Sequence, residues 1–334
     1  MRFLVTGAAG FIGFHLCRSL VLDGYPVVGV DNLDPYYSVQ LKRDRLAILE
    51  PNALFDFTES SVADERALTS IFNRFAPTHV VHLAAQAGVR YSLANPKAYV
   101  DANLVGFANV LECCRQHHVR HLVFASSSSV YGLNTDMPFS VRQNVDHPIS
   151  LYAATKKSNE LMAHSYSYLY DMPCTGLRFF TVYGPWGRPD MALFRFTSAM
   201  LEGKPIDVYN QGHMKRDFTY IDDSVECVRR LVHLPPVSNP DWDGRRPNPA
   251  TSPSPYRILN IGNGRTVGLM EFVSALEECL GAKANCNFLP MQPGDVAETH
   301  ADSTELFDLI GFRPKTTVRD GIRSFVDWYK AYFS

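Results

Sequence analysis

Two groups of residues in this chain have types and spacings that could do chemistry. Gly7, Gly10 and Gly13 follow a short apolar run and precede a helical pattern. Glycines placed in this way let backbone N–H groups approach a pyrophosphate at the start of a helix. Tyr152 and Lys156 stand at positions i and i+4, so they lie on one face of a helix. Together the two groups indicate a nicotinamide dinucleotide held beside a tyrosine base.

Tyr152 needs help to act as a base, because an isolated tyrosine has a pKa of about 10. A lysine ammonium and a cationic nicotinamide nearby both favour the phenolate, so we expect Lys156 to activate it. An exposed Tyr–Lys pair is the alternative, but the glycine-rich run and a serine run at 126–129 weigh against it. No Gly-x-Ser-x-Gly sequence surrounds the serines, so a hydrolase has little support.

Asp31 ends a predicted strand shortly after the glycine-rich run. A carboxylate there can accept hydrogen bonds from ribose hydroxyls and would repel a 2′-phosphate, which favours NAD over NADP. The alternative is an Asp that caps the turn before Asn32.

The elements that must position these residues follow an α/β pattern. Short Val-, Ile- and Leu-rich runs alternate with helical patterns, as repeated β-α-β units require. We therefore predict a Rossmann-type doubly wound parallel sheet with a smaller C-terminal α/β substrate domain. The cofactor domain is expected over residues 1–180, with later segments returning to it, and the substrate domain mainly over 181–334. Strands are predicted over 3–6, 27–30, 79–83, 121–125 and 174–179.

Composition argues against several classes of protein. The net charge of -2 gives no field that would gather polyanions, so neither nucleic acid nor a membrane surface is an expected partner. No apolar stretch approaches about 18 residues, and no signal-peptide pattern is present. The seven cysteines are scattered and lack metal-type spacing, which suits reduced core thiols in the cytoplasm.

No metal site is expected. His79 and His82 bracket a strand on opposite faces, and His117, His118 and His121 stand at a helix-to-strand turn without carboxylates or cysteines at ligand spacing. We interpret all five as surface or capping histidines.

Across nearly its whole length the chain resembles the NAD-dependent sugar-nucleotide epimerase/dehydratase family of extended short-chain dehydrogenase/reductases. It is most similar to the UDP-glucuronate 4-epimerases of that family. The segments that carry the resemblance are 31–33 with Tyr36-Tyr37, 87–92, 126–132, 151–157, 178–191 and 216–223.

The resemblance implies an NAD site that extends beyond the glycine-rich run. Its expected members are Gly7, Gly10, Phe11, Ile12, Gly13, Asp31, Asn32, Ser61, Val62, Leu83, Ala84, Ala85, Asn103, Tyr152 and Lys156. Lys156 is expected to bond the nicotinamide ribose, and Asn103 to be structural or cofactor-linked. Ser61-Val62 departs from the usual Asp-Ile or Asp-Leu, so we expect a weaker or water-bridged contact to the adenine amino group.

The resemblance also implies a reaction. Tyr152 takes the proton of the sugar 4-hydroxyl, to which Ser127 bonds, while the C4 hydride passes to NAD. The resulting 4-keto sugar turns and receives the hydride on its other face. NAD is regenerated in each turnover, so tight retention is expected.

A 4-keto uronate loses carbon dioxide readily when its C5–carboxylate bond aligns with the carbonyl π system. Ser128, Ser129, Thr181 and Arg188 correspond to positions that can hold the carboxylate out of that alignment. Many epimerases of uncharged sugars carry Asn where this chain has Thr181. A surface loop charge is the alternative interpretation of Arg188.

The diphosphate of a UDP-sugar is expected to meet Arg216, which aligns with a phosphate-binding arginine of relatives. Asp295 lies in a segment that in relatives closes over the nucleotide. Gln292 stands where some relatives have arginine, which leaves the group facing the second phosphate open; Arg90 is the weaker candidate.

Three other functions stay open. UDP-glucuronate decarboxylase shares the substrate and the first step, and UDP-glucose 4-epimerase is disfavoured by the carboxylate set. A non-catalytic NAD-sensing protein is possible on this fold, but the intact Ser127, Tyr152 and Lys156 argue against it. A 4,6-dehydratase is disfavoured because Ser128-Ser129 replaces the Asp-Glu pair that it needs.

A homodimer is expected because relatives often pair two helices of each subunit. Leu161, Met162, Tyr166 and Leu169 could form that helix face. By periodicity alone, the same stripe could instead pack on the sheet.

Overall fold

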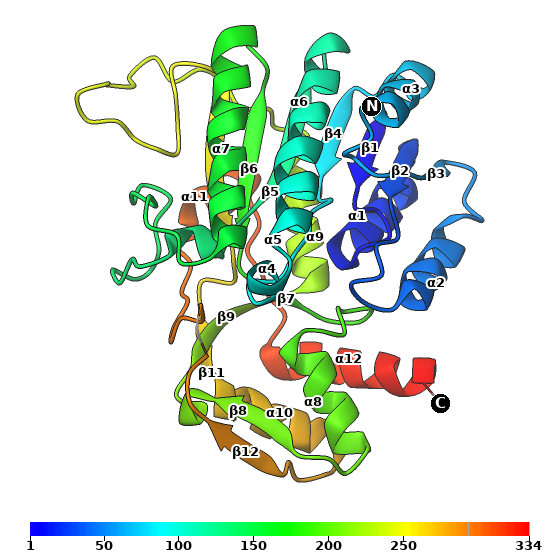
Figure 1. Ribbon diagram of the computed structural model, residues 1–334, viewed down its shortest axis with the longest axis vertical. Coiled ribbons are helices and arrows are strands. Elements are labelled where there is room, and N and C mark those ends of the chain that lie inside the picture. Colours follow the sequence, from blue (N-terminus) through cyan, green and yellow to red (C-terminus); the bar gives the residue numbers. More distant parts are fainter. Residues whose placement is uncertain (293, 334) are drawn as a thin grey trace.

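The computed structural model describes residues 1–292 and 294–333, and Figure 1 shows two parts stacked vertically. The strands are β1 (Phe3–Thr6), β2 (Val27–Asp31), β3 (Phe55–Glu59), β4 (His79–His82), β5 (His121–Ser127), β6 (Cys174–Phe179), β7 (Thr181–Tyr183), β8 (Ile206–Tyr209), β9 (Lys215–Tyr220), β10 (Tyr256–Ile261), β11 (Thr266–Gly268) and β12 (Cys286–Leu289). The helices are α1 (Phe11–Leu22), α2 (Val39–Leu49), α3 (Glu65–Phe75), α4 (Tyr91–Ala94), α5 (Pro96–Tyr99), α6 (Gly106–Gln116), α7 (Leu151–Tyr170), α8 (Ala192–Leu201), α9 (Ile221–Leu231), α10 (Leu269–Leu280), α11 (Thr304–Ile310) and α12 (Val318–Phe333). Short turns are η1 (Val100–Val105, π-helical), η2 (Ser128–Tyr131) and η3 (Asn210–Gly212).

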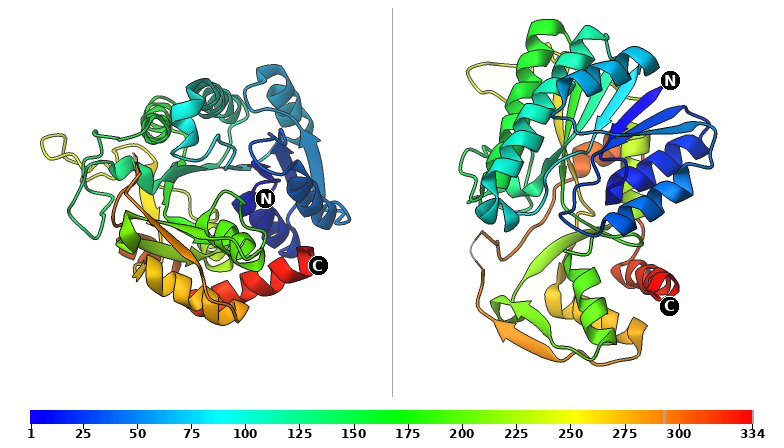
Figure 2. Two further views of the ribbon diagram at one scale, coloured as in Figure 1. Left: turned by 60° about the horizontal axis from the view of Figure 1, so that its bottom comes forward. Right: turned by 45° about the vertical axis from the view of Figure 1, so that its right-hand side comes forward.

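The upper part is built on a parallel sheet of seven strands in the order β10-β6-β5-β4-β1-β2-β3. Helices α3, α6 and α7 share one apolar core with the sheet, and α1, α9 and α11 share another (Figure 2). The predicted doubly wound α/β fold is therefore confirmed. The predicted strands do not include β3, a half-exposed edge strand, or β10, which returns to this sheet from the later part of the chain.

The lower part holds a three-stranded sheet, β11-β9-β7, and a two-stranded sheet, β12-β8. Helices α8, α10 and α12 pack around a third apolar core, in which Phe218 and Phe272 stack with ring centroids 4.4 Å apart. Trp186 packs on this core and also contacts Phe14 of α1, so its loop touches both parts.

The interpretation of three histidines as surface or capping residues is wrong. His79, His82 and His121 are buried, because β4 and β5 lie inside the sheet with helices on both faces. His82 Nδ1 lies 2.8 Å from the Thr6 hydroxyl, and burial lowers the pKa of both His82 and His121 to about 3, so both are neutral. Among the described residues, no group of three or more His, Cys, Asp or Glu side chains could hold a metal ion.

Five of the seven cysteines are buried, whereas Cys279 and Cys286 are half-buried. Nowhere in residues 1–292 and 294–333 does a helix have the length and apolar character needed to cross a membrane.

Candidate active site

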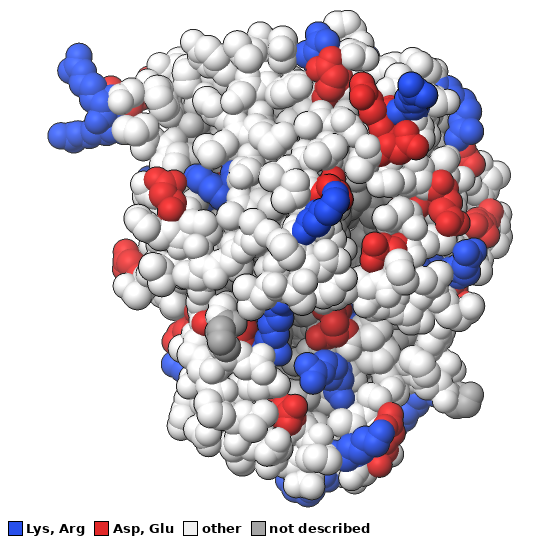
Figure 3. Space-filling view, in the orientation of Figure 1, with Lys and Arg blue, Asp and Glu red and all other residues white. Residues whose placement is uncertain are grey.

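A cavity of about 970 Å³ lies where the carboxyl ends of the sheet strands face the lower part of the molecule. Every predicted site residue except Asn103 lines it. The strands are parallel, so the segments that follow β1, β2, β4 and β5 all begin at the same edge of the sheet, the one formed by the carboxyl ends of its strands. Figure 3 shows the face of the molecule seen in Figure 1, where acidic and basic side chains are interspersed and border a hollow between the upper and lower parts.

The glycine-rich run forms a tight turn between β1 and α1. Gly7 has a φ of +73°, and a Cβ there would lie 2.7 Å from the Ala84 nitrogen. A Cβ on Gly13 would lie 2.0 Å from the Gly7 oxygen. Helix α1 begins after Gly10, and no side chain caps its N-terminus. The residues of its first turn line the cavity, so their N–H groups can donate to a ligand there. This geometry fits a dinucleotide pyrophosphate.

Asp31 holds its carboxylate at the cavity edge. One oxygen accepts a hydrogen bond from the Leu33 nitrogen at 2.9 Å, and the other accepts one from the Ala9 nitrogen at 3.2 Å. Burial raises the pKa of Asp31, and the charge of Lys42 opposes that rise. The fixed acceptor suits ribose hydroxyls, and Lys42 is a cavity cation that the sequence analysis did not single out.

Asn103 lies behind the cavity wall, in the π-helical turn η1. Its side chain accepts from the Gln86 nitrogen at 2.8 Å and donates to the Gln86 oxygen and the Thr155 hydroxyl. Asn103 therefore ties the cavity-lining segment after β4 to helix α7. Of the two roles considered for it, this position favours the structural one.

Tyr152 and Lys156 point from α7 toward the end of β5. The Ser150 hydroxyl caps the helix by accepting from the Ala153 nitrogen. Lys156 Nζ donates to the Ala125 oxygen at 2.8 Å, and burial lowers its pKa to about 8. Burial raises the pKa of Tyr152, while its hydrogen bond with Ser127 and the charge of Arg188 lower it. Ser127 and Arg188 thus favour the phenolate, a role that the sequence analysis assigned to Lys156.

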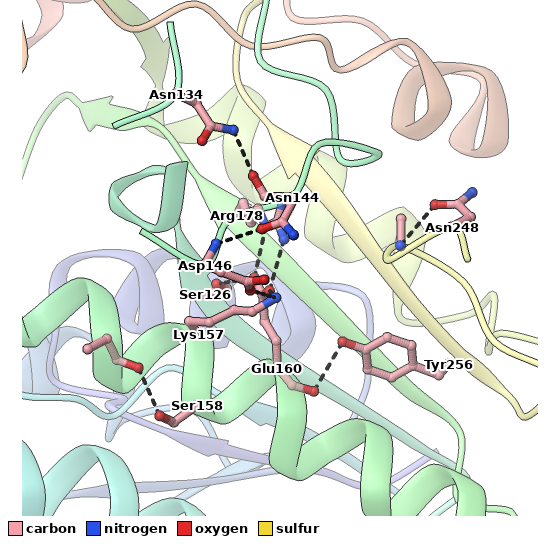
Figure 4. Close-up of polar contacts among 12 residues, drawn as sticks. Ser126, Asn134, Asn144, Asp146, Lys157, Ser158, Glu160, Arg178, Asn248 and Tyr256 are labelled. Carbon is pink, nitrogen blue, oxygen red and sulfur yellow. Dashed lines mark hydrogen bonds and ion pairs between the residues drawn. The ribbon is translucent and has the colours of Figure 1, made fainter. Parts of the chain in front are cut away.

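The serine run is hydrogen-bonded to the buried ion pair between Glu160 and Arg178, which Figure 4 shows. Ser126 Oγ donates to Glu160 of α7 at 2.7 Å, and Arg178 of β6 donates to both oxygens of the same carboxylate. Within the serine run, Ser127 Oγ accepts a hydrogen bond from the Ser129 nitrogen at 3.1 Å. The contacts join α7, β5 and β6 beside Tyr152.

The predicted carboxylate-binding residues line the same cavity. Ser128 and Ser129 lie in η2, and Thr181 begins β7. Arg188 lies in the loop before α8 and pairs with Asp190 through Nε at 3.0 Å and Nη2 at 2.5 Å. This pairing was not predicted from the sequence, although Asp190 falls in a segment that carried the family resemblance.

Arg216 and Asp295 lie together where the cavity meets the segment before α11. Arg216 donates to the carbonyl oxygens of Val296 and Ala297, and burial lowers its pKa. Arg90 reaches from the segment after β4 and forms an ion pair with Asp295 at 2.8 Å. Three residues that were predicted to meet the nucleotide therefore lie close together at the cavity.

Comparisons with known proteins agree with this geometry. The family model described as "NAD dependent epimerase/dehydratase family" matches residues 3–239. "Protein CapI" of Staphylococcus aureus is 55% identical over 333 residues, covering 100% of this chain and 99% of that protein. "Probable UDP-glucuronate 4-epimerase" of Rhizobium meliloti is 51% identical over 333 residues, covering 98% and 97%.

Solved structures are similar over nearly the whole chain. The UDP-glucuronic acid 4-epimerase of Bacillus cereus, in complex with UDP-glucuronic acid and NAD, has a TM-score of 0.86 at 32% identity, covering 99% of this chain and 100% of that one. With a family model that matches most of its length, the chain belongs to the NAD dependent epimerase/dehydratase family.

Proposed function

We propose that this chain is a 4-epimerase that interconverts UDP-glucuronate and UDP-galacturonate and keeps NAD bound. The observation that carries the proposal is a single cavity lined by the Tyr152–Ser127 pair and by the predicted carboxylate-binding set. Relatives support the same substrate and cofactor, since one is named for this reaction and another was solved with UDP-glucuronic acid and NAD.

The reacting end of the sugar lies beside Tyr152. NAD, when bound, accepts the hydride from C4 and returns it. Tyr152 removes the proton of the 4-hydroxyl and later restores it, and Ser127 holds that oxygen in line. Lys156 bonds the nicotinamide ribose, and its ammonium adds to the charge that favours the phenolate.

The rest of the cavity binds the two ligands along their length. The N–H groups at the start of α1 hold the NAD pyrophosphate and Asp31 holds the adenosine ribose. Arg216, with Arg90 and Asp295, holds the UDP diphosphate and ribose. In this assignment residues 1–180, with returning segments, bind NAD, and residues 181–334 mainly bind the UDP-sugar.

The protein acts as a cytoplasmic homodimer in this proposal. Leu161 and Leu169 of α7 are 57% and 66% exposed and form the contact, with Tyr168 beside them. Met162 and Tyr166 pack on the core of their own chain, so the dimer contact is narrower than the stripe predicted from the sequence.

The test is incubation of the purified protein with UDP-glucuronate, first without and then with added NAD, followed by proton NMR. We expect UDP-galacturonate, and a loss of about 10²–10⁴-fold in rate for Tyr152→Phe. Tyr170→Phe, which changes an exposed tyrosine on the same helix, is the matched control and should keep full activity.

Two outcomes would contradict the proposal. Carbon dioxide with UDP-xylose as the main products would identify a decarboxylase. Turnover of UDP-glucose but not of UDP-glucuronate would identify an epimerase of neutral sugars.

A further inference from the structure

Two polar side chains, those of Asp190 and Tyr36, lie beside the guanidinium of Arg188. Asp190 accepts from Arg188 Nε at 3.0 Å and from Nη2 at 2.5 Å. The hydroxyl of Tyr36, which lies between β2 and α2, donates to the same Asp190 oxygen, Oδ2, at 3.3 Å. Burial alone would lower the pKa of Arg188, but the charge of Asp190 raises it, so the guanidinium stays charged.

The backbone around Arg188 is held from the same side of the cavity. Arg45 of α2 is fully buried and donates to the carbonyl oxygens of Ala9 and Trp186, at 2.8 and 2.6 Å. His15 of α1 adds a bond to the Pro185 oxygen at 3.0 Å. The loop that carries Arg188 is thus fastened to the glycine-rich turn and to α1 and α2.

A guanidinium has five N–H donors in one rigid plane. Nε and Nη2 of Arg188 both donate to Asp190, so the guanidinium plane is fixed and the remaining donors on Nη1 and Nη2 are confined to that plane. Arg188 lines the cavity with 22% of its side chain exposed, which leaves it within reach of a ligand. A carboxylate that binds the remaining donors must adopt the orientation that this plane sets.

We propose that Asp190, braced by Tyr36, is a positioning residue that fixes the plane of Arg188 and thereby the orientation of the substrate carboxylate. The inference rests on the proposed function, because it takes the carboxylate to be that of a uronate. Asp190 itself need not touch the substrate, and its negative charge makes direct contact with a carboxylate unfavourable.

The consequence concerns a side reaction of the 4-keto uronate. Decarboxylation breaks the bond between C5 and the carboxylate carbon; its electron pair enters the enolate of the 4-keto group, carbon dioxide leaves, and water supplies a proton to C5. The step requires that bond to align with the carbonyl π system. A guanidinium free to rotate would let the carboxylate reach that alignment more often.

The experiment compares Asp190→Asn, Asp190→Ala and Tyr36→Phe with the wild type on UDP-glucuronate. The readout is the ratio of carbon dioxide to UDP-galacturonate, with UDP affinity and thermal unfolding measured alongside. We expect the ratio to rise at least about fivefold for both Asp190 variants and less for Tyr36→Phe, which removes one bond to Asp190. UDP affinity should stay within about twofold, because the residues proposed to hold the diphosphate are unchanged.

Asp308→Asn is the matched control, since Asp308 forms an exposed ion pair with Arg313 remote from the cavity lining. It should leave the ratio unchanged. An unchanged ratio in both Asp190 variants, with UDP still bound, would overturn the positioning role while the wild type still makes UDP-galacturonate. A wild type that makes no UDP-galacturonate would remove the proposed function and this inference with it.

Discussion

Arg178 on β6 and Glu160 on α7 form a bidentate ion pair in the interior, with bonds of 2.8 and 2.9 Å and both side chains almost fully buried. The same carboxylate accepts from Ser126, which directly precedes Ser127. Burial would raise the pKa of Glu160, but the charge and hydrogen bonds of Arg178 lower it, so the pair is ionised. The helix that carries Tyr152 is thereby fixed relative to the strand that carries Ser127.

Glu160→Gln should strongly destabilise the protein, because it leaves the Arg178 charge buried without its partner. Breaking a buried pair in this way costs about 3–5 kcal/mol. Urea denaturation of the variant measures the loss in the free energy of unfolding. Lys97→Gln is the control, since Lys97 and Asp101 form an exposed helical pair worth about 0.3–0.5 kcal/mol. Equal losses in the two variants would contradict the assigned role.

Ser127→Ala should move the acid limb of the kcat/KM profile to higher pH. The base must be deprotonated, so activity is lost as the pH falls through the pKa of Tyr152. The hydrogen bond with Ser127 lowers that pKa, and its removal raises it. A pH profile from turnover measurements tests this, with the exposed Ser165→Ala of α7 as control. A limb that stays in place, or moves to lower pH, would count against the contact.

Gly13→Ala should weaken retention of NAD. The added Cβ would lie 2.0 Å from the Gly7 oxygen, so the turn before α1 must open. Overpacking of this kind costs about 1–3 kcal/mol, and about tenfold weaker retention corresponds to ~1.4 kcal/mol. NAD content per chain after gel filtration is the measurement. Gly268→Ala, where a Cβ would meet nothing closer than 4.0 Å, should keep the wild-type content.

Replacing Leu161 and Leu169 together by Glu should convert the dimer to a monomer. Both side chains are largely exposed on α7, and charges placed in an apolar contact must be desolvated on association. Analytical ultracentrifugation reports the mass. Leu22→Glu changes an equally exposed leucine of α1 and should not alter it. A wild type that is already monomeric would refute the proposed assembly.

Much of the cofactor site can be predicted from the sequence, because its signals are local. A turn of glycines between an apolar run and a helical pattern specifies its own backbone conformation. The i, i+4 spacing of Tyr152 and Lys156 likewise places them on one helix face whatever surrounds the helix. Asp31 follows from the end of its strand. These features need only the conformation of neighbouring residues.

The burial of His82 shows where such reasoning ends. The sequence of its strand is equally compatible with helices on one face of the sheet or on both faces. Only the packing of α6 and its neighbours over β4 makes the His82 ring a buried, neutral partner of Thr6. Edge strand β3 also escaped prediction, because a half-exposed edge mixes polar with apolar residues.

By itself, the sequence determined the doubly wound sheet, the glycine turn and the Tyr–Lys helix, since backbone preference and apolar periodicity act over a few residues. Only the tertiary structure decided that Tyr36 would contact Asp190, which is 154 positions away in the sequence. It also decided that Arg188 would pair with Asp190 at the cavity wall. Such contacts depend on how whole elements pack, and an Asp two positions after an Arg is equally compatible with a solvated loop.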